Sequence, residues 1–164
     1  MPPVLKLLGC YHQLQVRSGR GASAYDSKLY TNTLAELLVG VRIVGEEAGG
    51  MMDTIAKTMA EAAHCPYHNV DIPRVAKEQI RYVVDGQQEP NPEGTDIVIA
   101  NSFPQYRKAW GLVREFHMFK TFSDLLKCQD GLLICGIDHI CGLKALFAET
   151  YDVRHFVPPY RKLL

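Results

Sequence analysis

Two histidines of this sequence stand in the same short motif, Gly-x-x-His, and each motif ends a run of apolar residues. The first motif is Gly9–His12, after an apolar run that begins at Val4, and the second is Gly136–His139, after the run 132–136. A neutral imidazole can bind a divalent metal ion or take up a proton as a general base. The two motifs therefore indicate a site built around His12 and His139.

Acidic residues follow a third apolar run. Glu46 and Glu47 come directly after 41–45, a segment rich in β-branched residues that is typical of a strand. A carboxylate beside two imidazoles suits a transition-metal site with an open position, or a general base oriented by a carboxylate. Which glutamate serves the site stays open, with Glu47 slightly preferred. The alternative for the pair is an exposed helix N-terminus, where the helix dipole favours acids.

Strands and helices alternate along the chain and must position these residues. Apolar runs predict strands at 4–10, 41–45, 68–72, 132–136 and 151–157, and helical spacing predicts helices at 27–39, 51–63, 74–84, 104–127 and 139–149. Such alternation implies parallel crossovers. We expect an α/β fold with a mostly parallel central sheet flanked by helices on both faces, in three layers, as a single domain over 1–164. Ligands bind at the carboxyl ends of such strands, where all three groups lie.

The order and spacing of these motifs resembles the superfamily of TraB, PrgY and TIKI proteins, together with erythromycin esterase-like and ChaN-like proteins. That group has two Gly-x-x-His motifs, an acid after the second strand, and an arginine on the helix before the last motif. The arginine here would be Arg114, in a segment similar to the family's Arg-(Asp/Asn/Glu)-x-x-Met pattern. The residues from His139 onward are similar to its His-x-x-Gly-Leu-x-x-Leu, so the resemblance runs from about Val4 to Glu149.

The resemblance implies a hydrolase that cleaves an ester, amide or phosphoester bond in a small molecule or peptide. Its branches include a metal-dependent peptidase, a lactone esterase with a histidine base, and haem-binding proteins. His12 would be the base or a metal ligand, with His139 as its partner across the site. Glu46 or Glu47 would orient a histidine or bind the metal ion. Arg114 would pair with that acid or stabilise negative charge in the substrate or transition state.

The cofactor implied is a divalent ion (Mn, Co or Zn) held by His12, Glu47 and His139. Haem is the second choice, with Tyr11 as a conceivable ligand. Asp138, beside His139, would orient an imidazole or ligate a metal, but a turn-forming hydrogen bond is the preferred interpretation of this residue. Two other functions stay open: a non-catalytic domain that holds a metal or haem as a sensor, and an inactive interaction protein that keeps the fold.

Composition limits the partners. Lys plus Arg and Asp plus Glu both number 18, so there is no global excess of positive charge to meet nucleic acid. No apolar run approaches the ~18–20 residues that span a bilayer, so no membrane partner is expected. Five cysteines, an odd number without a secretion signal, are typical of a reducing compartment, and we expect a cytoplasmic protein. The oligomeric state stays open, with a homodimer as one option.

Overall fold

The computed structural model describes residues 2–16, 22–73 and 104–160, without the side chains of 104–110. Within these residues, five strands form one sheet in the order β3-β2-β4-β1-β5. They are β1 (Val4–Cys10), β2 (Ile43–Glu46), β3 (Tyr67–Asn69), β4 (Gly131–Gly136) and β5 (Asp152–Phe156). Every pair of neighbouring strands is parallel.

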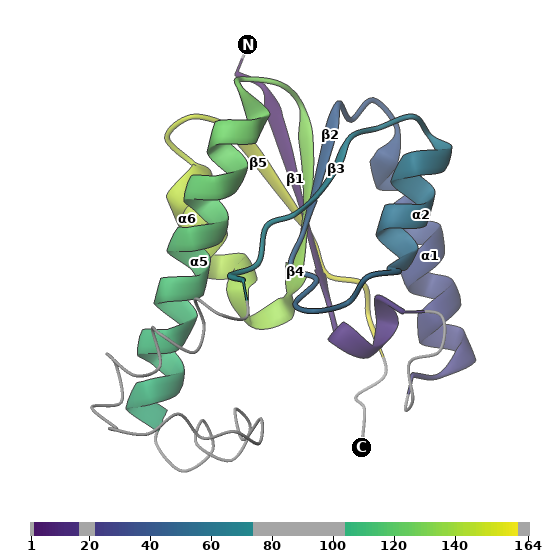
Figure 1. The fold of residues 1–164 in the computed structure, drawn as a ribbon, viewed down its shortest axis with the longest axis horizontal. Coiled ribbons are helices and arrows are strands. Elements are labelled where there is room, and N and C mark those ends of the chain that lie inside the picture. Colours follow the sequence, from purple (N-terminus) through teal and green to yellow (C-terminus); the bar gives the residue numbers. More distant parts are fainter. Residues whose placement is uncertain (1, 17–21, 74–103, 161–164) are drawn as a thin grey trace.

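Helices cover both faces of this sheet. Figure 1 shows α1 (Ala24–Leu38) and α2 (Ile55–Ala62) on one side, and α5 (Pro104–Leu126) and α6 (Ile140–Phe147) on the other. Each side has its own core: Tyr30 and Leu34 of α1 pack in one, and Phe122 of α5 and Phe147 of α6 in the other. The predicted three-layer α/β fold with helices on both faces is therefore confirmed.

The central strand β4 shows why apolar runs form this sheet. Its residues alternate between the two cores, with Leu132 and Ile134 on the α1 side and Leu133 and Cys135 on the α5 side. A parallel strand covered on both faces must be apolar at every position, which the run 131–136 satisfies. Cys10 and Cys135 are both buried, as expected of small core residues, and burial raises the pKa of each thiol.

Several predicted boundaries change: α1 begins at Ala24 and not at residue 27, and β2 begins at Ile43 and not at residue 41. Glu46 is the last residue of β2 and does not follow it. Helix α2 begins at Ile55 and not at residue 51, because the Thr54 hydroxyl caps it by accepting a hydrogen bond from the Lys57 N–H. Strand β3 covers only three residues, Tyr67–Asn69. The helix predicted at 74–84 lies outside the described residues. Within the described ranges, no helix combines the length and the apolar character needed to cross a membrane.

The strand order decides where the motifs meet. Strands β2, β4 and β1 are neighbours in the sheet and run the same way. The segments that follow them therefore leave the same edge side by side, at the lower end of the sheet in Figure 1. These are the segments that carry Glu47, His139 and His12.

Candidate active site

Glu47 lies at the centre of the group. Its side chain is fully buried, and its Oε2 accepts a hydrogen bond of 2.8 Å from the Gly136 N–H of β4. Its Oε1 forms an ion pair with Arg114. The Nε2 atoms of His139 and His12 lie 3.6 and 3.8 Å from that same Oε1. The structure thus brings together four of the predicted site residues around one carboxylate.

Two short turns present the histidines. His12 begins the 3-10 turn His12–Leu14 directly after β1, and His139 ends the 3-10 turn Ile137–His139 directly after β4. Gly9 is the second-last residue of β1, and His12 begins the turn that follows; Gly136 is the last residue of β4, and His139 ends the turn that follows. The same spacing therefore arises in two different ways.

Arg114 reaches the group from α5, on the far side from α1 and α2. One terminal nitrogen of the guanidinium contacts Glu47 and also lies 3.3 Å from Asp71 Oδ1. The side chain is only 17% exposed, and its Nε is buried with no hydrogen-bond partner among the described residues. In the structure, Arg114 points inward and pairs with a glutamate, as the sequence predicts.

Glu115 supports His139. The His139 Nδ1 lies 3.0 Å from Glu115 Oε1, and both residues are buried. An ionised carboxylate only accepts hydrogen bonds, so chemistry assigns the ring proton to Nδ1 and leaves Nε2 with a lone pair. Gly142 of α6 makes room for this contact, since a Cβ there would overlap the Glu115 carboxylate.

His12 is held by a different kind of group. Its Nδ1 lies 2.8 Å from the side-chain oxygen of Gln15, which is fully buried. The His12 side chain itself is 51% exposed, whereas that of His139 is 10% exposed. One imidazole therefore lies at the surface of the group and the other inside it.

Glu46 points away from the histidines. It is fully buried, with Oε2 accepting hydrogen bonds from Thr54 Oγ1 at 2.5 Å and Tyr67 Oη at 2.6 Å. Its Oε1 accepts one from Gln15 Nε2 at 3.0 Å. Burial raises the pKa of Glu46, and these hydrogen bonds oppose that rise. Successive strand residues face opposite sides, so only Glu47 joins the group around Arg114.

Two further predicted residues lie beside the group. The ring of Tyr11 is half-buried and packs on the ring of Tyr160, with centroids 5.7 Å apart. Asp138 is an exposed residue of the 3-10 turn that ends at His139. The roles predicted for them, as haem ligand and as orienting acid, stay predictions.

Three residues of the group were not predicted: Gln15, Asp71 and Glu115. Glu115 stands next to Arg114 in the motif, so its proximity could have been suspected. Asp71 follows β3 as Glu47 follows β2, which is the same signal at a weaker strand. Gln15 carried no signal, because an amide three residues after a histidine is common by chance.

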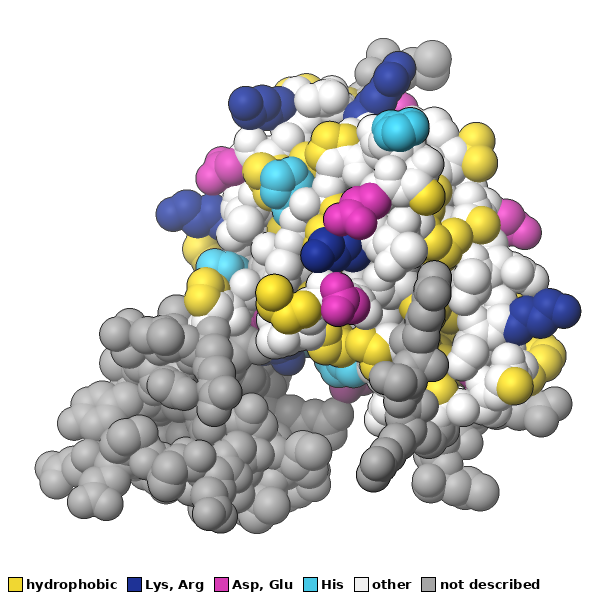
Figure 2. All heavy atoms as spheres, turned by 45° about the vertical axis from the view of Figure 1, so that its right-hand side comes forward, with side chains coloured by type: hydrophobic (Ala, Val, Ile, Leu, Met, Phe, Trp, Pro, Cys, Tyr) yellow, Lys and Arg dark blue, Asp and Glu magenta, His cyan; other side chains and the backbone are white. Residues whose placement is uncertain are grey.

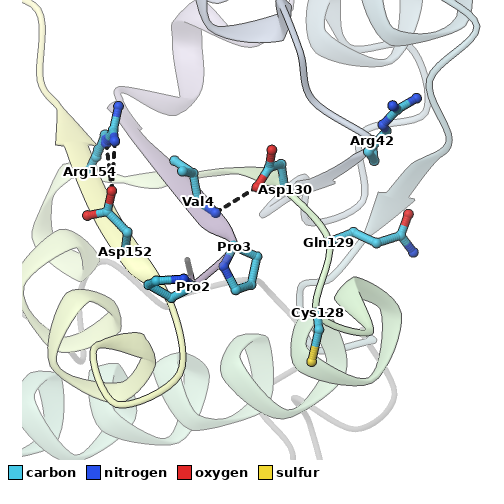
Figure 3. Close-up of a pocket in the computed structure, with 9 residues that line it drawn as sticks. All are labelled: Pro2, Pro3, Val4, Arg42, Cys128, Gln129, Asp130, Asp152 and Arg154. Carbon is cyan, nitrogen blue, oxygen red and sulfur yellow. Dashed lines mark hydrogen bonds and ion pairs between the residues drawn. The ribbon is translucent and has the colours of Figure 1, made fainter.

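A separate hollow of about 700 Å³ lies at the opposite edge of the sheet, at the amino ends of β1, β4 and β5. Figure 3 shows two of its polar contacts: Arg154 pairs with Asp152, and Asp130 accepts a hydrogen bond from the Val4 N–H. Arg42 points away from the centre. Figure 2 shows basic and acidic side chains interspersed over another face, in keeping with the balanced charge. Neither surface gathers reactive groups as the strand-end group does.

Comparison with known proteins adds no family. No family model matches the chain, and neither the curated proteins nor the solved structures contain a match. Within the described part of the chain, no group of three or more His, Cys, Asp and Glu side chains is arranged to hold a metal ion. What the site can do is therefore argued from its own geometry.

Proposed function

We propose that this protein is a hydrolase in which His12 and His139 act together on one water molecule beside Glu47 and Arg114. The observation that carries the proposal is that two Nε2 atoms face the same buried oxygen, Glu47 Oε1, at 3.6 and 3.8 Å. These distances are too long for direct hydrogen bonds. A molecule with two hydrogens to donate would satisfy both ring nitrogens at once.

His139 is the general base in this proposal. Its Nε2 takes a proton from the water as the water oxygen attacks the scissile carbonyl or phosphoryl centre, and later returns that proton to the leaving group. Glu115 holds the ring by Nδ1 and stabilises its protonated form, as the carboxylate of a catalytic triad does. His12 accepts the second hydrogen of the water and orients it.

Arg114 stabilises the negative charge that develops on the substrate oxygen. One terminal nitrogen of the guanidinium contacts Glu47 and Asp71, and the side chain is 17% exposed. A substrate oxygen would approach the exposed part of the guanidinium and accept a hydrogen bond there. Because Glu47 and Asp71 neutralise the guanidinium in the resting site, the charge is held in place before substrate binds.

A metal-dependent hydrolase is the second candidate. Imidazole nitrogen and carboxylate oxygen are donor types that Mn, Co or Zn accept, and His12, His139 and Glu47 would supply them. Against it, Glu47 Oε1 is already paired with Arg114, and Oε2 with the Gly136 N–H. A cation at the same oxygen would have to displace the guanidinium or sit against its charge, so no step above uses a metal.

We further propose a small-molecule or peptide substrate and a cytoplasmic location. All five cysteines are free in the structure, which suits a reducing compartment. The half-exposed ring of His12 suits a substrate that enters from solvent at the sheet edge.

The test is a rate measurement on the purified full chain. The probes are p-nitrophenyl acetate, a p-nitroanilide and p-nitrophenyl phosphate, one for each bond class. We expect turnover of at least one probe, and a loss of roughly 100-fold or more in kcat/KM for His139→Ala. The control is His155→Ala, an exposed histidine of the edge strand β5. Equal rates for wild type and His139→Ala on every probe would overturn the proposal.

A further inference from the structure

The orientation of the Gln15 amide is determined by its neighbours. Its Nε2 lies 3.0 Å from the main-chain oxygen of Glu47 and 3.0 Å from Glu46 Oε1. A main-chain carbonyl can only accept a hydrogen bond, so the atom facing it must be the nitrogen. The side-chain oxygen of Gln15 therefore faces His12, and the two assignments cannot be exchanged without losing two hydrogen bonds.

This orientation dictates where His12 carries its proton. An amide oxygen only accepts, so the His12 Nδ1, 2.8 Å away, must be the donor. When the ring is neutral, Nε2 then has the lone pair, and that is the atom nearest Glu47. The opposite tautomer would place two lone pairs against each other at Nδ1.

Glu46 holds the amide nitrogen of Gln15, whereas the amide oxygen faces His12. Glu46 Oε1 takes one hydrogen of the amide, while Oε2 takes the hydroxyl hydrogens of Thr54 and Tyr67. Thr54 also caps α2, and the main-chain oxygen of Gln15 accepts a hydrogen bond from the Ile55 N–H. The amide is thus bonded directly to Glu46 of β2, and Glu46 is in turn held by Thr54 at the start of α2 and by Tyr67 of β3.

We propose that Gln15 is a positioning residue that holds His12 in the Nδ1-protonated tautomer, and that Glu46 acts through Gln15 to keep it so. Under the proposed function this gives His12 the lone pair at Nε2 that orients the water. It also gives the buried Glu46 a role without contact with the substrate. The tautomer itself can be observed without any substrate.

The experiment is a long-range proton–nitrogen correlation spectrum of the full chain with isotope-labelled histidine, at a pH where the rings are neutral. His12→Ala assigns the His12 signals by their loss. We expect wild-type His12 to show a protonated Nδ1 and an unprotonated Nε2. Gln15→Lys keeps donors for Glu46 and Glu47 but offers His12 only hydrogens, so the two nitrogen signals should exchange character. Gln15→Leu should give a mixture of tautomers.

The matched control is Gln13→Leu, the same substitution at an exposed residue of the same turn, which should leave the His12 signals unchanged. A wild-type His12 protonated at Nε2 overturns the inference even if a variant fails to fold. An unchanged His12 spectrum in folded Gln15→Lys or Gln15→Leu overturns it as well. Because no substrate is added, these outcomes are independent of the rates measured on the three probes.

Discussion

His12 and His139 belong to the same kind of motif, but the Nδ1 atoms of the two rings are held by different groups. His139 is nearly buried, and its Nδ1 is held by the carboxylate of Glu115, which comes from a distant helix. His12 is half exposed, and its Nδ1 is held by the neutral amide of Gln15, three residues along the same turn. An anionic partner stabilises a protonated ring more than a neutral one does. Under the proposed function, proton transfer therefore falls to His139 and orientation of the water to His12.

Removing the charge behind His139 gives the largest expected effect. Glu115→Gln keeps an acceptor for the Nδ1 proton but removes the negative charge that stabilises the protonated ring. We expect kcat/KM on the best probe to fall by a factor of roughly 10 to 10⁴, the upper end being the effect of the same acid-to-amide change in a catalytic triad. The control is Glu36→Gln on the exposed face of α1. If Glu115→Gln keeps the wild-type rate, the charge of Glu115 does not distinguish the role of His139 from that of His12.

The next largest effect is expected from a substitution that displaces the Glu115 side chain while leaving Glu115 in the sequence. A Cβ at Gly142 would overlap the Glu115 carboxylate and displace it from His139, so Gly142→Ala should be less stable than a helical Gly→Ala variant without such an overlap, by about 1–3 kcal/mol. Urea unfolding measures this. Gly111→Ala is the matched control, because Gly111 is also helical but a Cβ there meets nothing within 4 Å. That variant should gain about 0.5–1 kcal/mol. A Gly142→Ala variant that gains as much stability as Gly111→Ala would mean that Glu115 is not held where the structure places it.

The groups that hold His12 lead to a smaller expected effect, a change of the free energy of unfolding with pH. Burial raises the pKa of Glu46 above the ordinary 4.5, so the folded state holds this proton more tightly than the unfolded chain. Its contribution to stability is full below pH 4.5 and is lost as the pH rises through the folded-state pKa. Glu46→Gln cannot ionise and avoids that loss.

The measurement is urea unfolding of wild type and Glu46→Gln across the pH range above 4.5. We expect the variant to gain free energy of unfolding relative to wild type as the pH rises. A difference that stays constant with pH would show that the Glu46 carboxyl titrates as it does in the unfolded chain. The Gln15 anchor would then be an ordinary ionised carboxylate.

Much of this fold could be predicted from the sequence, because a parallel strand buried on both faces must be apolar throughout. The runs at β1 and β4 carry that pattern, and their Gly-x-x-His endings located His12 and His139. The start of α2 could not be placed, because the apolar spacing continues back through Met51 and Met52 while the Thr54 cap decides the boundary.

The choice between Glu46 and Glu47 could not be made for a related reason. A shift of one residue in a strand exchanges the two faces of the sheet, and the sequence pattern does not resolve one residue at a strand end. Whether Asp71 and Glu115 join the site depends on how β3 and α5 pack against the neighbouring strands. Such contacts between distant segments leave no local pattern.

The central claim is that the two histidines act as one unit on one water molecule, and a double-mutant cycle tests it most directly. It compares kcat/KM of wild type, His12→Ala, His139→Ala and the double variant on the probe that is hydrolysed. Residues that act as a unit give strongly non-additive losses. The account predicts that the double variant is no slower than His139→Ala alone. Losses that multiply would contradict it, because each histidine would then act separately.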